Sequence, residues 1–127
     1  MNTKIKGGAG EDLVARFLKN KGYIIVENNY LCRGGEIDII AKDKDDYVFV
    51  EVKTRLEGEN TEESALDAFS YTKQKRFIWA VNSYLSFKKI QNPYRIDLVI
   101  IFKRDDELRL KHFINYEIDE KVSRFLW

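Results

Sequence analysis

The chain of 127 residues has very few of the side chains that bind zinc or form disulfides: one cysteine, Cys32, and one histidine, His112. A single cysteine excludes a disulfide within the chain and fits a reducing cytoplasm, where we expect the protein to act. One cysteine and one histidine are too few for zinc sites built from these side chains. They also disfavour a cysteine nucleophile, because His112 lies in an ordinary strand-like run and would have to serve as its partner.

The chain also lacks long hydrophobic runs and an excess of one charge. No apolar stretch approaches the roughly 20 residues of a membrane-spanning helix, and the opening segment MNTKIKGGAGEDL contains nothing that resembles a secretory signal. With 22 basic and 21 acidic residues, the net charge is only +1. We therefore expect no membrane association, and any nucleic-acid binding must come from a local basic patch.

The pattern of apolar residues predicts one α/β domain. A chain of this length can bury one real core but not two, and we assign 1–127 to a single domain with its core at about 6–115. Helices are predicted at Glu11–Lys21 and, capped by Ser70, at 70–87. Five predicted strands cover 23–30, 36–42, 47–55, 95–102 and 107–115. The order αβββαββ predicts a mixed central sheet flanked by helices.

Three further expectations concern single segments. The strand at 95–102 is almost continuously apolar, so we expect it to be covered on both faces. Its two charged residues, Arg95 and Asp97, are expected to form a structural pair or a contact at the sheet end. A loop is predicted at 56–69 and a short terminal helix at 119–127.

Charged side chains stand in the two strands that the turn DKDD, residues 43–46, joins. A turn centred in this segment sets Asp38 opposite Glu51, with Cβ atoms about 4.5–5.5 Å apart. Two carboxylates at that distance repel each other unless a cation lies between them, and Mg²⁺ is usually held by one or two carboxylates with water and phosphate oxygens. Lys53, two residues beyond Glu51, lies on the same face of the strand.

A salt-bridged hairpin on a solvated sheet face is the alternative, with Lys53 neutralising one carboxylate. The charged face also carries Ile40 and Phe49, which favours a buried site. We expect the opposite face to be a complete core face, made of Ile37, Ile39, Val48, Val50 and Val52.

Two predicted helices direct polar groups towards a similar place. Glu11 lies on the edge of the apolar face of the first helix, and Gln74 lies within the apolar stripe of the second. For Gln74, a hydrogen bond to a nearby backbone group is the alternative. Glu36 is a weaker candidate, for which a solvated strand end is the alternative.

The pattern of Asp38 followed by EVK at 51–53, on adjacent strands after a helix with a glutamate, resembles the PD-(D/E)xK nuclease superfamily, which has the restriction-endonuclease-like fold. The segments KGGAGEDLVARFL, GGEIDIIA, FVEVKTR, KQKR and RIDLVII together resemble the bacterial YraN family. That family is largely uncharacterised and is related in fold to archaeal Holliday-junction resolvases. The resemblance runs from about Lys6 to Phe102. The superfamily's proline before the aspartate is absent, since Ile37 stands there.

This resemblance implies a metal-dependent nuclease that hydrolyses phosphodiester bonds of structured or branched DNA. It implies one or two Mg²⁺ or Mn²⁺ ions, held by Asp38, Glu51 and the backbone carbonyl of Val52. It implies catalytic roles for Lys53, Glu11 and Gln74. Resolvases of this fold act as dimers, so a homodimer is the corresponding expectation by analogy.

Phosphate contacts outside the site require cations, and five basic residues are candidates for nucleic-acid binding: Arg33, Arg55, Lys73, Lys75 and Arg76. A solvated basic face is the alternative. We expect Tyr71 and Trp79 to pack in the core, with base stacking as the alternative. Two other functions stay open: a non-catalytic nucleic-acid-binding module with an idle site, and a protein-interaction domain anchored by the terminal RFLW.

Overall fold

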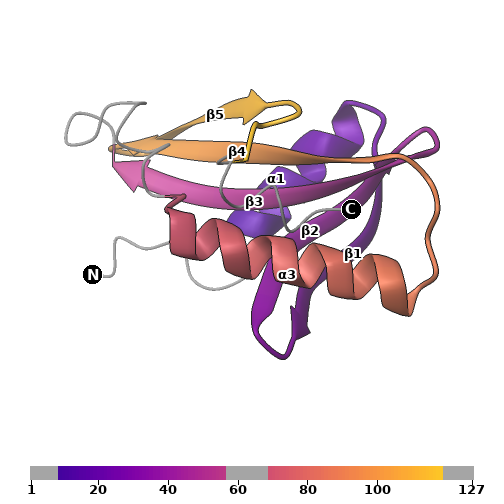
Figure 1. The fold of residues 1–127 in the computed structure, drawn as a ribbon. Coiled ribbons are helices and arrows are strands. Elements are labelled where there is room, and N and C mark those ends of the chain that lie inside the picture. The colour runs from indigo at the N-terminus through magenta and orange to yellow at the C-terminus, as the bar shows by residue number, and fades with distance from the viewer. Residues whose placement is uncertain (1–8, 57–68, 119–127) are drawn as a thin grey trace.

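In the computed structural model, which describes residues 9–56 and 69–118, a five-stranded sheet separates two helices (Figure 1). The elements follow the predicted order αβββαββ: α1 Ala9–Asn20, β1 Ile24–Cys32, β2 Gly35–Asp43, β3 Asp46–Leu56, α3 Tyr71–Phe87, β4 Tyr94–Arg104 and β5 Glu107–Phe113. The α/β class and the flanking helices are therefore confirmed. The extent of the domain at its two ends stays a prediction. The loop at 56–69, apart from its end residues, and the whole of the predicted terminal helix at 119–127 lie outside the described residues.

The sheet is mixed, as expected, with the strands in their chain order from β1 to β5. The β1–β2, β2–β3 and β4–β5 pairs are antiparallel, and the β3–β4 pair is parallel. Parallel strands need a long crossover, and α3 lies in the segment that connects β3 to β4. In the β2–β3 hairpin, Ile40 pairs with Phe49 and Lys42 with Tyr47, as predicted. The paired residues end at Ile39 and Val50, so the predicted pair of Asp38 and Glu51 is not part of the ladder.

Each face of the sheet packs against one helix. The α3 face joins Ile40 and Phe49 to a cluster that includes Phe77 and Val81 of the helix. On the opposite face, Ile39, Val48 and Val50 of the sheet pack in a second cluster with Val14 and Leu18 of α1. Strand β4 contributes alternate residues to both clusters, so the prediction that it is covered on both faces is confirmed. Burying each of these large apolar side chains contributes about 1.5–3 kcal/mol to folding.

The predicted helix ends are largely correct. The hydroxyl Oγ of Ser70 accepts a hydrogen bond from the backbone N–H of Lys73, 3.3 Å away, and so caps α3. Gly22 follows α1 with a φ of 97°, a conformation that glycine adopts without strain. Across the parts of the chain that the structure covers, neither helix combines the length and apolar character needed to cross a bilayer.

The prediction that Ile37 belongs to the face with Ile39 is wrong. Ile37 packs in the α3 cluster, together with Ile40. The paired residues of β2 and β3 end at Ile39 and Val50, and β2 continues beyond that point beside β1 alone. Simple alternation of side chains assumes a continuous ladder, so it fails where the two strands part. Strand β1 is also longer than predicted, because the turn occupies only Arg33 and Gly34.

Candidate active site

Strands β2 and β3 part at Asp38. Its carboxylate oxygen Oδ2 accepts a hydrogen bond from the backbone N–H of Val52 across a distance of 2.8 Å. In a regular antiparallel ladder, such an amide donates to a carbonyl of the neighbouring strand. The Asp38 side chain therefore replaces a backbone acceptor, which leaves its carboxylate fixed in the opening between the strands.

Two more carboxylates lie near Asp38. Burial raises the pKa of the Asp38 carboxyl, and the charge of Glu51 and a hydrogen bond with its side chain raise it further. The charge of Glu11 on α1 acts in the same direction. The charges of Glu51 on β3 and Glu11 on α1 thus both act on Asp38 of β2. Glu11 does not line the cavity described below.

Lys53 compensates part of this negative charge. Its Nζ atom lies 2.8 Å from Oε2 of Glu51, and the two side chains are only 15% and 12% exposed. The salt bridge that was the alternative interpretation of this hairpin is therefore present. The salt bridge coexists with the carboxyl groups of Asp38 and Glu11, so Lys53 pairs with one of these three acidic side chains.

A cavity of about 570 Å³ opens beside these residues. Its walls come from the β1–β2 hairpin, from β3 and from the first turns of α3, and include Gly35, Glu36, Glu51, Lys53, Lys73 and Arg76. Glu36, the weaker candidate, is exposed and lines this wall. A second cavity of about 540 Å³ lies near the other end of α3, and none of the described residues that line it is acidic.

The β1–β2 hairpin forms a fixed wall of the cavity because it packs directly on α3. A Cβ atom on Gly35 would overlap the carbonyl oxygen of Arg76, so only glycine allows this approach. The indole Nε1–H of Trp79 donates to the carbonyl oxygen of Arg33 at a distance of 2.9 Å. Trp79 itself is 63% exposed and Tyr71 is 42% exposed, so the expectation that both pack in the core is wrong.

The candidate DNA-contacting residues divide into two groups. Lys73 and Arg76 line the cavity, and the charges of Lys53 and Arg55 reach Lys73, where the charge of Lys53 is the main cause that lowers its pKa. Arg33 is exposed at the hairpin turn. Lys75 does not line the cavity, and its Nζ atom lies 5.6 Å from the ring centroid of Tyr71.

Gln74 is buried, 7% exposed, in the first turn of α3. Its Nε2 donates to the carbonyl oxygen of Phe69 at a distance of 2.7 Å. This is the backbone contact that the sequence left open as its alternative role. Gln74 does not line the cavity, and its catalytic role stays a prediction.

The donor atoms fit a hard divalent cation. Asp38 and Glu51 supply carboxylate oxygens, which Mg²⁺ and Mn²⁺ prefer over nitrogen and sulfur. Within residues 9–56 and 69–118, no group of three or more histidine, cysteine, aspartate or glutamate side chains is placed to hold a metal. A cation here would depend on two carboxylates, a backbone carbonyl and water, which is the usual supply for Mg²⁺.

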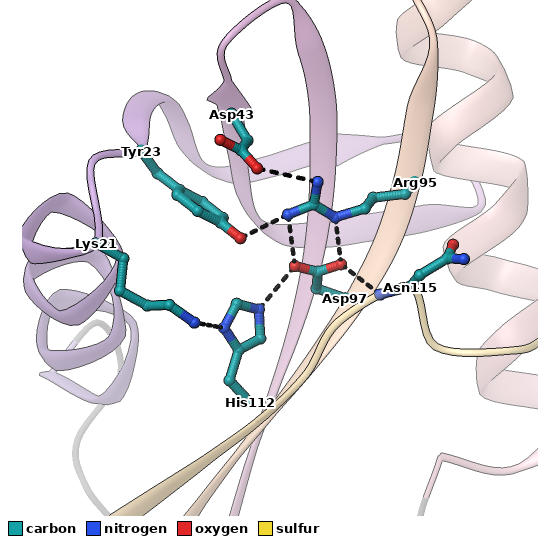
Figure 2. Close-up of polar contacts among 7 residues, drawn as sticks. All are labelled: Lys21, Tyr23, Asp43, Arg95, Asp97, His112 and Asn115. Carbon is teal, nitrogen blue, oxygen red and sulfur yellow. Dashed lines mark hydrogen bonds and ion pairs between the residues drawn. The ribbon is translucent and has the colours of Figure 1, made fainter.

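A second polar cluster lies on the α1 face of the sheet, and sequence reasoning found only part of it (Figure 2). Asp97 is fully buried and accepts hydrogen bonds from Arg95 Nε at 3.0 Å, His112 Nε2 at 2.7 Å and the backbone N–H of Asn115 at 2.9 Å. The pair of Arg95 and Asp97 is thus confirmed. His112, which was treated as an ordinary strand residue, also contacts Lys21, with 2.7 Å between Nδ1 and Nζ.

Residues from several elements supply hydrogen-bond partners to the polar side chains of this cluster. Arg95 also donates to Tyr23 and to Asp43, at 2.5 Å and 3.2 Å. An ammonium group at Nδ1 places the ring proton of His112 on Nε2, from which it is donated to Asp97. The only usable signal in the sequence was the charge of Asp97 in an apolar strand. Its partners are distant in sequence, so spacing gave no indication of them.

The comparisons with known proteins define the family. The model of a family described as Uncharacterised protein family UPF0102 matches residues 10–101. The chain belongs to this family. A UPF0102 protein of Clostridium botulinum (strain Loch Maree / Type A3) is 42% identical over 98 residues, which cover 73% of this chain and 76% of the relative. A UPF0102 protein of Chlorobium chlorochromatii (strain CaD3) is 44% identical over 93 residues, covering 73% and 70%.

The UPF0102 match confirms the expected YraN-like family and extends over all the predicted metal ligands and catalytic residues. The wider relationship to the PD-(D/E)xK superfamily and to the resolvases stays a prediction. Action in the cytoplasm and a homodimer also stay predictions.

Proposed function

We propose that this UPF0102 protein is a metal-dependent nuclease that hydrolyses phosphodiester bonds in structured or branched DNA. One observation carries the proposal. Asp38, Glu51 and Lys53 converge where β2 leaves β3, beside a cavity that Lys73 and Arg76 line. A purely structural hairpin has no need for a second carboxylate beside an ion pair that is already complete.

The chain's own residues would divide the work as follows. Asp38 and Glu51, with the carbonyl of Val52, would hold one or two Mg²⁺ or Mn²⁺ ions. When bound, such an ion supplies Lewis-acid chemistry for phosphodiester hydrolysis. Lys53 would turn its ammonium group from Glu51 towards the phosphate and stabilise the negative charge that develops there. Glu11 would accept a hydrogen bond from a water molecule near Asp38.

The basic residues around the cavity would hold the rest of the nucleic acid. Phosphate contacts position a nucleic acid and supply most of its nonspecific affinity. Lys73, Arg76 and Arg55 provide this charge locally, which the net charge of +1 does not. Arg33, exposed at the hairpin turn, extends the basic surface.

A cleavage panel tests the proposal. The full chain is incubated with single-stranded, duplex, flap and four-way DNA, with Mg²⁺, with Mn²⁺ and with a chelator. We expect cutting of the flap or four-way DNA in the presence of metal, and none with the Asp38→Asn variant. Binding without cutting in either metal would refute the nuclease.

Binding of DNA without cutting would instead support the other candidate function, a non-catalytic nucleic-acid-binding module. One observation favours it: in the ion pair between Lys53 and Glu51, the ammonium group of Lys53 can balance the charge of Glu51 in place of a metal ion. Absence of binding to every DNA and RNA at low salt would leave the protein-interaction domain. The RFLW segment on which that third function depends lies outside the described residues.

A further inference from the structure

Trp79 is a large aromatic side chain held in place yet open to solvent. Its N–H is bound to the carbonyl oxygen of Arg33 at 2.9 Å, and a Cβ atom added to Gly34 of the hairpin turn would lie 3.2 Å from the Cδ1 and Nε1 atoms of the indole. Even so, 63% of the residue is exposed. The hydrogen bond holds the indole beside the hairpin turn, and most of the residue stays accessible.

The position of Trp79 connects it to the candidate active site. A Cβ atom added to Gly34 would lie 3.2 Å from the indole, and Gly34 also lines the cavity. Arg76, which lines the cavity from α3, precedes Trp79 by three residues, and residues at this spacing are neighbours on a helix surface. Leu31, 70% exposed, adds an apolar side chain to the cavity wall. The hairpin turn at Gly34 therefore lies between the cavity and Trp79.

We propose that Trp79 stacks on an unpaired base of the nucleic acid bound at the candidate active site. This inference rests on the proposed function and names the feature of the substrate that the protein recognises. Aromatic side chains stack on any base, so the contact is tolerant of sequence. A base inside a duplex is already stacked on its neighbours, so the contact favours single-stranded and branched substrates over a continuous duplex.

Two exposed aromatic residues lie on α3, and their surroundings distinguish them. The ring of Tyr71 already carries the ammonium group of Lys75 at 5.6 Å from its centroid. Trp79 forms its hydrogen bond through Nε1, in the plane of the ring, and 63% of the residue is exposed. Base stacking requires an open ring face, which is why the geometry points to Trp79.

Binding measurements on matched DNA molecules test this inference. The dissociation constants of a fluorescein-labelled flap DNA and of a duplex of equal length are measured by anisotropy, in the presence of a chelator so that neither is cut. The Trp79→Ala variant lacks the stacking contact with one base, so its affinity for the flap should be about 5-fold to 150-fold weaker than that of the wild type. Duplex binding should stay nearly unchanged. Trp79→Phe, which lacks the N–H but keeps an aromatic face, should restore most of the flap affinity.

The control is Phe87→Ala, which removes another exposed aromatic residue, 77% exposed, from the last position of the same helix. It should leave both affinities unchanged. Equal weakening of flap and duplex by Trp79→Ala, or no weakening of either, would overturn the stacking role while the proposed function stands. If the wild-type chain binds neither DNA, the proposed function fails, and the stacking role fails with it.

Tryptophan fluorescence provides a second readout. The chain contains two tryptophans, so a Trp127→Phe background leaves the emission of Trp79 alone. Stacking on an unlabelled single strand should quench this emission, and an equal concentration of duplex should quench it much less. Equal quenching by both would contradict selective stacking.

Discussion

The Nζ atom of Lys53 lies 2.8 Å from Oε2 of Glu51, inside a pair that is mostly shielded from solvent. Lys53→Met keeps the length of the side chain and removes its charge. In the proposed nuclease, losing a group that stabilises charge at the reacting phosphate should lower the cleavage rate about 100-fold or more. DNA binding should persist, because Lys73 and Arg76 remain. Parallel cleavage and gel-shift assays on one four-way DNA measure both, and a rate close to that of the wild type would contradict the catalytic role.

A divalent cation should stabilise the folded chain. A ligand that binds only the native state adds about 2.7 kcal/mol at roughly one hundred times its Kd. For a domain of this size, each kcal/mol raises the Tm by about 4 °C, so we expect a rise of roughly 10 °C in saturating Mn²⁺. Asp38→Asn should abolish the rise. A calorimetric scan with equal shifts in both proteins would place the metal elsewhere.

The basic residues of α3 should differ in their effect on DNA binding. Lys73→Ala and Arg76→Ala remove charges at the cavity, and each should reduce the slope of log K against log salt by about one. Lys75→Ala is the matched control, because Lys75 lies on the same helix but does not line the cavity. A gel-shift salt titration gives all three slopes. Equal effects of Lys73→Ala and Lys75→Ala would show that the cavity does not define the binding surface.

Asp97 should make the folding stability depend on acid pH. Burial alone would raise the pKa of its carboxyl, but hydrogen bonds from His112, Arg95 and the backbone of Asn115 outweigh burial and lower the pKa. The native state therefore releases this proton more readily than the unfolded state does. The resulting stability is present above the unfolded pKa of about 3.9 and is lost as the pH falls through the lower native pKa.

The variant Asp97→Asn tests that linkage. Near neutral pH it should destabilise the fold by about 3 kcal/mol, because it leaves buried donors without a charged acceptor. The gap to the wild type should narrow as the pH falls below about 4, where the wild-type carboxyl also takes up a proton. Urea unfolding at several pH values measures the gap. Asp106→Asn, at an exposed position in the β4–β5 turn, is the control, and a constant gap for Asp97→Asn would contradict the linkage.

The contact between the hairpin and α3 should tolerate no side chain at Gly35. A Cβ there would overlap the carbonyl of Arg76, so Gly35→Ala should cost at least about 3 kcal/mol of folding free energy. Gly22→Ala is a comparison without a collision, since nothing lies within 4 Å of the added Cβ. Its positive φ should cost about 1–2 kcal/mol. Equal losses in denaturant unfolding would mean that the hairpin shifts to make room.

The sequence was most informative where local rules act without interruption. The hairpin register, with Ile40 opposite Phe49, followed from the alternation of side chains and a turn of known position. The same alternation misplaced Ile37, because it cannot detect that the paired ladder ends after Ile39. A break in a ladder depends on what the neighbouring strand does, which a single strand's pattern does not contain.

Contacts between distant residues were beyond the reach of sequence reasoning. The hydrogen bond from Arg95 to Tyr23 joins residues 72 positions apart, and no spacing rule relates them. The exposure of Trp79 was also missed, because an aromatic residue beside an apolar stripe normally indicates core. Its anchor, the Arg33 carbonyl, lies 46 positions away.

The hydrogen bond from Val52 to Asp38 gives the site a spectroscopic reporter of its own. The acceptor of this backbone amide is a side-chain carboxylate rather than a carbonyl. The chemical shift of the Val52 amide proton and its rate of exchange with solvent are therefore coupled to the charge on Asp38. A proton or a cation arriving at that carboxylate will alter the signal of one assigned amide, and nuclear magnetic resonance can observe it without any substrate.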